Sequence, residues 1–211
     1  MTTINERQIK CPFCSNILNI VEVTSFSVAE KDSDFFPHYL GANPMPILVE
    51  TCPNCKFTEY TANFEDIISD REREKIGRVL KKMKYNPEIT PAEKYKNLAL
   101  CNIARERSSI EIGDCYLKSA WCDRLDENRE DEIRALRKAV NYFEIGLKSN
   151  EISGTEELVV RYLAGEIYRR IDDNEKALSY WQDLQNELAL IEKKDSWLTS
   201  WVEAGLKKLK D

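Results

Sequence analysis

The segments Cys11-Pro12-Phe13-Cys14 and Cys52-Pro53-Asn54-Cys55 decide the fold of the N-terminal part of this chain. Two residues between the cysteines of each pair let both sulfurs point into one tight turn. Two such turns that face each other make a tetrahedral set of four thiolates, the closed coordination found in structural Zn²⁺ sites. We therefore predict one structural zinc ion, with the ligands Cys11, Cys14, Cys52 and Cys55.

Iron is the alternative metal, because paired Cys-x-x-Cys turns also hold a single iron in rubredoxin-like electron carriers. Those domains usually have a glycine after the second cysteine and a compact aromatic core of their own. Neither feature is evident here, so zinc is favoured over iron. A redox-active cysteine pair is disfavoured as well, because the βαβ context of thioredoxin is missing.

The cysteine count and the first residues indicate a reducing compartment. The chain has seven cysteines, an odd number, and residues 1–10 are polar, without the apolar stretch of a secretory signal. A disulfide framework belongs to oxidising compartments. We therefore expect a cytoplasmic protein. No membrane partner is expected either, because no apolar run is long enough to span a bilayer.

Composition divides the 211 residues near residue 64. The first 64 residues hold five of the seven prolines, both cysteine pairs and the only histidine, whereas the remainder holds all four tryptophans. We predict an α+β, predominantly α fold: a zinc-ribbon-like β domain over residues 1–64 and a helical domain over residues 65–211. The first domain is too small to fold on its own apolar core, so it needs a metal.

Two stretches of the first domain are rich in β-branched residues. Residues 17–23, which continue into 24–28, predict one long strand or a bent pair, and residues 46–51 predict the strand that delivers the second cysteine pair. Each Cys-x-x-Cys then lies on a turn at a strand end. A glycine often follows such turns; here Asn16 tolerates a left-handed backbone, and Lys56 does so less readily.

The segment between the cysteine pairs is dense in polar side chains. Acid, imidazole, phenol and amide groups occur within 12 residues, at Asp32, Asp34, His38, Tyr39 and Asn43. One interpretation is a small polar pocket or a second metal site. The favoured interpretation is a proline-braced loop, in which aromatic rings plug the ribbon while Asp34 and Asn43 hydrogen-bond to local backbone.

The order of these segments resembles a known family. Cys-Pro-x-Cys, then Asp-Phe-Phe-Pro-His-Tyr-Leu-Gly-Ala-Asn-Pro at residues 34–44, then a second Cys-Pro-x-Cys is similar to the bacterial family catalogued as domain of unknown function 2225. The resemblance covers nearly the whole chain and implies a zinc-ribbon-type start followed by tetratricopeptide-like helices. It implies an architecture and no reaction, because the family has no established activity.

From residue 65 onward the apolar residues recur at helical spacing. They predict a first helix that ends before residue 86, and a second that opens at Pro91 with Thr90 as its N-cap. A third and a fourth helix are predicted near residues 109–126 and 130–149. Buried positions are predicted for the three remaining cysteines, Cys101, Cys115 and Cys122.

The last third of the chain carries a repeat pattern. The small and aromatic residues of a tetratricopeptide unit are matched by Ala164, Gly165, Tyr168, Ala177 and Trp181. A looser copy upstream consists of Leu117, Ala120, Ala139 and Phe143. A final helix over residues 196–209 is expected to cap the array with Trp197 and Trp201; the alternative is that both tryptophans form an exposed docking surface.

The net charge of −6 disfavours nucleic acid as a partner, because nucleic-acid-binding ribbons usually present a basic face. One local exception is the stretch over residues 71–84, which we interpret as a solvated helix face. Its basic residues are Arg71, Arg73, Lys75, Arg78, Lys81, Lys82 and Lys84.

No known catalytic motif is present, neither a Gly-rich phosphate loop nor His-Glu-x-x-His nor Gly-x-Ser-x-Gly. The leading hypothesis is therefore a cytoplasmic adaptor whose helical array binds a protein or peptide partner. The alternatives are nucleic-acid binding through residues 71–84, and an enzyme or sensor with a site in residues 32–44, where acid–base chemistry by a histidine would depend on His38.

Overall fold

The computed structural model describes residues 2–84, 86, 88–190 and 197–209. Within them the strands are β1 (Thr3–Lys10), β2 (Ile17–Ser25), β3 (Val28–Lys31), β4 (Pro37–Tyr39), β5 (Val49–Thr51) and β6 (Thr58–Tyr60). The helices are α1 (Met45–Leu48), α2 (Asp70–Leu80), α3 (Pro91–Ala104), α4 (Ser109–Leu125), α5 (Arg129–Lys148), α6 (Thr155–Arg170), α7 (Asn174–Leu190) and α8 (Trp197–Lys208), with a 3₁₀ turn η1 (Thr61–Asn63).

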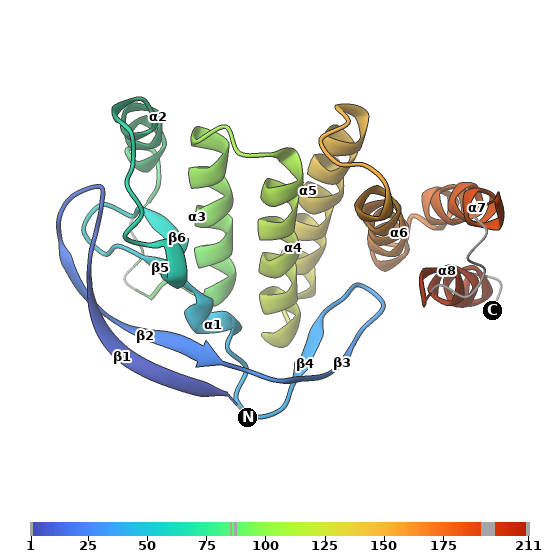
Figure 1. Ribbon diagram of the computed structural model, residues 1–211, viewed down its shortest axis with the longest axis horizontal. Helices are drawn as coiled ribbons and strands as arrows, with labels where there is room; N and C mark the ends of the chain where they lie inside the picture. The colour runs from blue at the N-terminus through green and yellow to red at the C-terminus, as the bar shows by residue number, and fades with distance from the viewer. Residues whose placement is uncertain (1, 85, 87, 191–196, 210–211) are drawn as a thin grey trace.

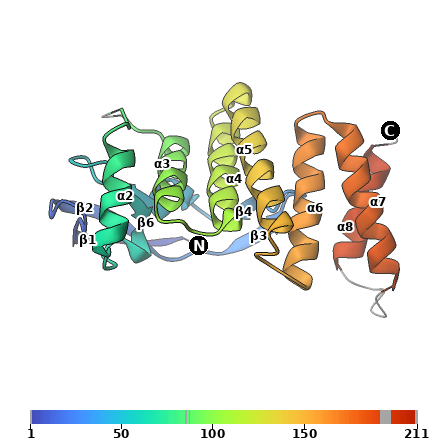
Figure 2. The same ribbon diagram turned by 90° about the horizontal axis from the view of Figure 1, so that it is seen from above.

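The strands form three separate antiparallel hairpins, β1–β2, β3–β4 and β5–β6. The helices follow one another in a row, with β1 to β4 along one side of α3 and α4 (Figures 1 and 2). The prediction of a mostly helical chain with a small N-terminal strand region is confirmed. None of the helices in the described part of the chain is long and apolar enough to cross a membrane.

The strand predictions are right in part. Residues 17–28 form a bent pair, because β2 ends at Ser25 and β3 begins at Val28. The prediction for residues 46–51 is wrong in its first half: Met45–Leu48 forms one helical turn, and only Val49–Thr51 is a strand. Proline suits the first turn of a helix, which explains why this stretch does not begin as a strand. Strand β1 was not predicted.

The helix predictions depend on local caps, which the structure contains. The side chain of Thr90 accepts a hydrogen bond from the N–H of Glu93, and the carboxylate of Glu93 accepts one from the N–H of Thr90, a complete capping box. Helices α4 and α5 begin and end within one residue of the predicted bounds. The first residue of the predicted final helix lies outside the described residues, and α8 begins at Trp197.

Each helix from α3 to α8 packs against the next one in the chain. Three of these pairs place a glycine of one helix against an aromatic ring of its neighbour, the third being Gly205 of α8 against Trp181 of α7. A Cβ atom on Gly165 of α6 would lie 2.5 Å from Nε1 of Trp181 on α7, and one on Gly113 of α4 would lie 2.6 Å from the ring of Phe143 on α5. Any larger residue would push these helix pairs apart.

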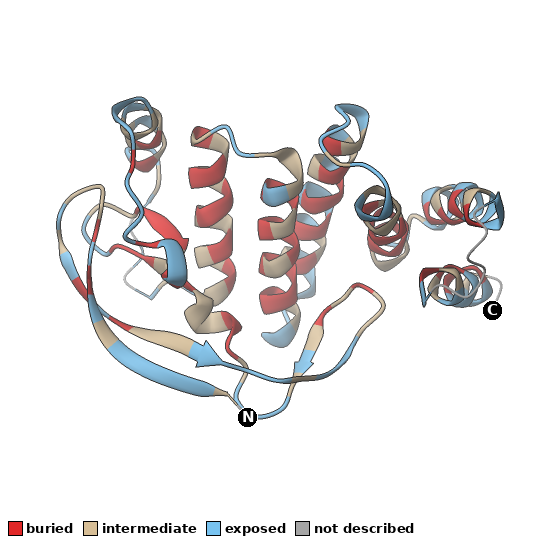
Figure 3. Cartoon of the chain, viewed as in Figure 1, coloured by how far each residue is buried: buried red, intermediate tan, exposed pale blue. Residues whose placement is uncertain are grey.

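The apolar core crosses the predicted domain boundary at residue 64. One cluster of buried side chains joins Cys11, Cys52 and Phe57 to Ile76 of α2 and Cys101 of α3. A larger cluster includes residues near β4, α1 and β5 together with residues of α3 to α6. Figure 3 shows buried residues along the length of α3 and α4. The division into 1–64 and 65–211 stays a prediction, and these two parts share an apolar interface.

Candidate metal centre and its surroundings

The four paired cysteines come together at the ends of two hairpins. Strand β1 ends one residue before Cys11 and β5 ends one residue before Cys52. The four Sγ atoms lie within 4.8 Å of one another, and the Sγ–Sγ distance is 3.6 Å both from Cys11 to Cys55 and from Cys14 to Cys52. A tetrahedral metal with bonds of about 2.3 Å to sulfur needs sulfurs about 3.8 Å apart. This cysteine cluster could therefore hold a metal ion with little change in either turn.

The two turns of the cysteine cluster share one backbone pattern. In the first turn the N–H of Cys11 donates to the carbonyl of Asn16 (2.8 Å), and that of Ser15 donates to the carbonyl of Cys11 (2.9 Å). In the second turn Cys52 and Lys56 repeat both bonds at 2.8 Å. These bonds orient the sulfurs before any metal binds.

Each turn closes on a residue with a left-handed backbone. The residues are Ser15, with φ 62°, and Lys56, with φ 68°. The expectation that Asn16 takes this role is therefore wrong by one position. The amino group of Lys56 donates to the carbonyls of Leu80 (3.4 Å) and Met83 (2.6 Å) at the end of α2. These bonds help to offset the strain that a left-handed backbone imposes on a residue with a side chain.

The thiols of Cys11 and Cys55 affect each other's pKa. A hydrogen bond with Cys55 lowers the pKa of Cys11 to about 5 and raises the pKa of Cys55 itself; backbone N–H groups of Cys14 and Phe13 also lower the pKa of Cys11. Burial raises the pKa of Cys52 to about 11. Thiolates are the form that binds a metal, so binding releases protons and metal affinity falls at low pH.

Arg73 of α2 holds the first turn from outside. Its guanidinium donates to the carbonyls of Phe13 (2.5 Å) and Pro12 (2.7 Å), and it lies 5.4 Å from the centre of the Phe13 ring. The Phe13 ring in turn stacks near Phe57, with centroids 6.5 Å apart. Arg73 therefore fixes the position of the turn, and the interpretation of residues 71–84 as a purely solvated face is wrong for this residue.

The other basic residues of this stretch divide into two groups. Arg71 and Lys75 pair with Glu106, with N–O distances of 3.6 and 2.5 Å, and Arg78 pairs with Glu74. The remaining three are exposed and have no ion pair within the described residues: Lys81, Lys82 and Lys84. Within residues 71–84, and apart from Arg73, the positive charge that has no ion pair in the described structure therefore lies at the end of α2 and in the loop after it.

Asp34 lies at the tip of the β3–β4 hairpin and is fully buried. Its carboxylate accepts hydrogen bonds from Trp121 Nε1 (3.0 Å), Arg124 Nη2 (2.6 Å) and Arg170 Nη2 (3.1 Å). Burial alone would raise the pKa of Asp34, but the two arginines and the indole lower it below its usual value of 3.8. The expectation that Asp34 bonds to local backbone is wrong, because its partners lie on α4 and α6. We call this set of four residues the Asp34 network.

Phe35, the residue after Asp34, also packs against the helices and not against the N-terminal strands. The ring of Phe35 lies 5.3 Å from Trp201, 6.0 Å from Trp197 and 5.7 Å from Tyr162, measured between centroids. Trp201 is partly buried against Phe35, whereas Trp197 is 50% exposed. The hairpin tip thus packs between α6 and α8, beside a pocket of 170 Å³ lined in part by Ser33, Tyr162 and Trp201. The expectation that the Phe35 ring plugs the ribbon is wrong.

The other polar groups of residues 32–44 have separate partners. His38 bonds to Asp32 (2.7 Å), and this bond raises the pKa of His38. Asn43 accepts a hydrogen bond from the N–H of Met45 (2.9 Å), a local contact as expected. Burial raises the pKa of Tyr39, whose ring packs edge-on against Phe26. His38 is therefore linked through Asp32 to Arg124 (3.8 Å) of the Asp34 network, whereas Tyr39 and Asn43 contact other parts of the chain.

The three remaining cysteines are buried, as predicted: Cys101, Cys115 and Cys122. Burial raises the pKa of each thiol to about 12. Thiols with so high a pKa are inert near neutral pH.

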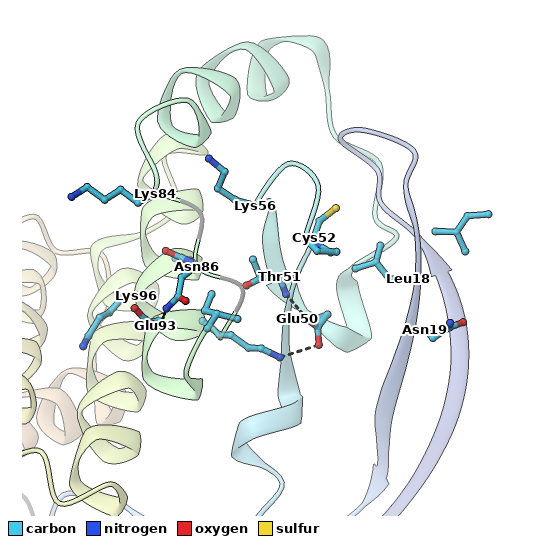
Figure 4. A pocket seen from close by; sticks show the side chains of 15 residues that line it. Leu18, Asn19, Glu50, Thr51, Cys52, Lys56, Lys84, Asn86, Glu93 and Lys96 are labelled. Atoms are coloured by element: carbon cyan, nitrogen blue, oxygen red, sulfur yellow. Dashed lines mark hydrogen bonds and ion pairs between the residues drawn. The ribbon is translucent and has the colours of Figure 1, made fainter.

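An open cleft of 720 Å³ lies beside the second turn (Figure 4). Its walls come from the start of β2, from β5 with the second turn, from the loop after α2, and from the first turns of α3. Cys52 of the metal centre forms part of the wall, although its side chain is buried. Sequence patterns gave no indication of this cleft, because its walls come from four separate segments.

Comparison with curated proteins and with solved structures finds no match. The profile of a family described as an uncharacterized protein conserved in bacteria (DUF2225) matches residues 4–195. The match includes all four cysteines of the metal centre and every helix from α1 to α7. It confirms the resemblance found from the order of the motifs. The chain therefore belongs to the bacterial family DUF2225.

Proposed function

We propose that this protein is a cytoplasmic adaptor, held together by one structural zinc ion, that binds a protein partner and catalyses no reaction itself. A closed set of four thiolates supports the structural role, because a catalytic zinc keeps one position open for water or substrate. In this role the metal would hold the two hairpin turns together, and Arg73 would hold the first turn against α2.

Zinc rather than iron is part of this proposal. The lack of a compact aromatic core no longer argues against iron, because Phe57 and Phe64 are fully buried beside the cluster. Their rings pack edge-on, with centroids 5.6 Å apart. The other argument remains, since Ser15 and Lys56 stand where a glycine is usual in rubredoxin-like turns. Element analysis of the purified protein tests the metal: about one zinc per chain supports the proposal, and a red, iron-containing protein contradicts it.

The helical part is proposed to be a tetratricopeptide-like array. The repeated contact of a small residue with an aromatic ring supports this, since Gly113 with Phe143 and Gly165 with Trp181 close successive helix pairs. Arrays of this kind use extended surfaces to bind partners.

One observation carries the adaptor proposal. Between α6 and α8 the chain's own hairpin tip packs through Phe35 and leaves a pocket of only 170 Å³. The cleft at α3, beside the second turn, is open and large enough for several side chains of a partner (Figure 4). The array thus offers a binding surface at the end that adjoins the metal centre, and the metal would keep that surface in shape.

The alternative functions have less support. An enzyme or sensor site in residues 32–44 is disfavoured because Asp34 already accepts bonds from three side chains and His38 is engaged by Asp32. Nucleic-acid binding through residues 71–84 is disfavoured because Arg71 and Lys75 are paired with Glu106.

The test is photo-crosslinking in a bacterial extract with the full-length, zinc-loaded protein. A photo-reactive residue replaces one exposed apolar residue at a time: Ile17 at the cleft, Leu125 at the end of α4, or Ile145 on α5. The expected result is one protein crosslinked from at least one position, and competed away by excess unmodified protein. The proposal is wrong if no position gives a competable crosslink while the purified protein turns over a metabolite.

A further inference from the structure

We propose that the 720 Å³ cleft beside the second turn binds an extended, acidic segment of a partner protein. This inference rests on the proposed adaptor function and names where the partner binds and what its chemistry is. It is carried by the free strand edges, the charge and the wall residues of the cleft.

Two strands present edges to the cleft. Within the described residues β2 pairs with β1 alone and β5 with β6 alone, so each has one edge without a neighbouring strand. The N–H of Thr51 in β5 donates to the side chain of the preceding residue, Glu50 (2.9 Å), instead of to another strand. A flexible side chain that covers an edge N–H can move aside, and an incoming strand then takes over the bond.

The charge of the cleft is opposite to that of the chain. Four lysines and two glutamates are among the described residues that line it, in a protein of net charge −6. Lys96 pairs with Asp123 (3.0 Å), which lies outside the lining, so the remaining net charge of the cleft is +1. Glu50 is neutralised by Lys94 (3.0 Å). Glu93 is used in the capping box of α3 and also accepts a bond from Asn86 (3.0 Å).

The uncompensated charge lies at one end. Lys56 donates only to backbone carbonyls, and Lys84 is exposed with no ion pair in the described part of the chain; both lie at the α2 end of the cleft (Figure 4). Lys81 and Lys82 lie close in sequence and are exposed as well. Carboxylates of a ligand would therefore be attracted to this end.

The wall of the cleft favours a peptide over a nucleic acid. Its apolar part is aliphatic: Ile17, Leu18, Pro53 and Ile89. Among the described residues that line it, none is aromatic or an arginine, and these are the side chains on which unpaired bases stack. Ile17 is 61% exposed, so an apolar side chain of a ligand can cover it. An extended segment with alternating acidic and apolar residues fits both the edge and the wall.

The probe is a fluorescein-labelled peptide of alternating Glu and Val residues, and binding to the zinc-loaded full-length protein is followed by fluorescence anisotropy. A Gln/Val peptide of the same length and a single-stranded oligonucleotide are the comparison ligands. The acidic peptide is expected to bind most tightly, with an affinity that falls as salt rises. No binding at low salt, equal binding of the Gln/Val peptide, or tighter binding of the oligonucleotide overturns the proposal.

Two pairs of variants locate the site. Ile17→Asp should weaken binding about tenfold through lost apolar contact and charge repulsion, whereas Ile4→Asp, at a residue of equal exposure (60%) on β1, should not. Lys84→Glu should weaken binding about threefold to fivefold, whereas Lys31→Glu on β3 should not. Equal effects within both pairs contradict the assignment, and thermal unfolding confirms that each variant is folded.

Failure of this inference differs from failure of the adaptor function. If a partner crosslinks from Leu125 or Ile145 but the acidic peptide does not bind, the adaptor function stands and the cleft is not its binding site. If the peptide binds with the expected pattern of variants but no partner is captured, the cleft is a binding site and the adaptor function lacks support.

Discussion

Two regions attach the hairpins to the helices, and they do so by different chemistry. At one end the cysteine cluster joins the first and second turns, and Arg73 ties it to α2. At the other end the Asp34 network ties the β3–β4 tip to α4 and α6. The cluster could hold a metal ion from outside, whereas the network uses side chains that the chain itself supplies. A chelator should therefore weaken one attachment and leave the other.

The largest effect is expected at the cysteine cluster. Cys52→Ser removes one ligand, and structural zinc contributes about 10–16 kcal/mol of apparent binding energy in zinc-finger peptides. Because Cys52 shares a buried cluster with Ile76 and Cys101, the hairpins should unfold and the packing of α2 on α3 should loosen. Thermal unfolding with and without a chelator measures this. Cys122→Ser is the control: it should stay sensitive to the chelator, whereas Cys52→Ser should be insensitive.

A smaller but still large effect is expected at the other attachment. Asp34→Ala removes the carboxylate that Arg124 and Arg170 share, and each arginine keeps another carboxylate partner, Glu132 and Glu166 respectively. The expected loss is therefore near the lower end of the about 3–5 kcal/mol for breaking a buried ion pair from one side. Urea unfolding should show this loss, while metal content stays at the wild-type level. Asp32→Ala, which removes a partly exposed partner of His38 and a longer contact with Arg124 (3.8 Å), should cost less, about 1 kcal/mol at most. Loss of metal in Asp34→Ala would show that the two attachments are not independent.

Arg73→Ala should have an intermediate effect that is confined to the metal end. It removes two hydrogen bonds to the backbone of the first turn, with an expected loss of about 1 kcal/mol and of about tenfold in zinc affinity. Competition with a fluorescent zinc chelator measures the affinity. Arg71→Ala is the matched control on the same helix. The Arg71 side chain is 79% exposed and forms a long ion pair with Glu106 (3.6 Å), so its loss should have little effect. Equal zinc affinities for both variants would refute the positioning role of Arg73.

The smallest expected effect is that of pH on the stability of the folded wild-type protein. The pKa of Asp34 is lower in the folded protein than its usual 3.8, so the stability that it contributes is present above pH 3.8 and is lost as pH falls through the folded value. Between pH 7 and 5 the network should therefore be insensitive to pH. Below about pH 4 the wild type should lose stability more steeply than Asp34→Asn in urea unfolding. Parallel pH profiles would mean that other carboxylates dominate acid unfolding.

The metal end was predictable because its pattern is local. Each cysteine pair has its own spacing, and the starts of α3 and α4 are set by caps within three residues, at Thr90 and Ser108. The Asp34 network has no such local pattern, since its partners are 87, 90 and 136 residues away. Helices α4 and α6 each have an arginine in the last turn, Arg124 and Arg170. The presence of an arginine in the sequence does not by itself identify its partner.

Two local errors have physical causes. Strand β1 was missed because all of it but Ile9 is exposed or partly exposed, so no apolar alternation marks it. The left-handed residue of the first turn was misplaced because Asn16 has the better intrinsic tolerance, whereas the hydrogen bonds that close the turn select Ser15. Tertiary and turn hydrogen bonds outweighed local preference in both places.

The distance between Asp34 and Arg170 along the chain has a consequence for synthesis on the ribosome. Cys11 meets Cys55 across 44 residues, so the metal turns can close early, whereas Asp34 must wait for an arginine that follows 136 residues later. At bacterial rates of translation this interval is on the order of ten seconds. The helices that cover the tip follow at different times: Phe36 packs on Trp121 of α4, whereas Phe35 packs on Tyr162 of α6 and Trp201 of α8. The Phe35 ring therefore stays uncovered longer than Phe36, and its docking is expected to be a late step of folding.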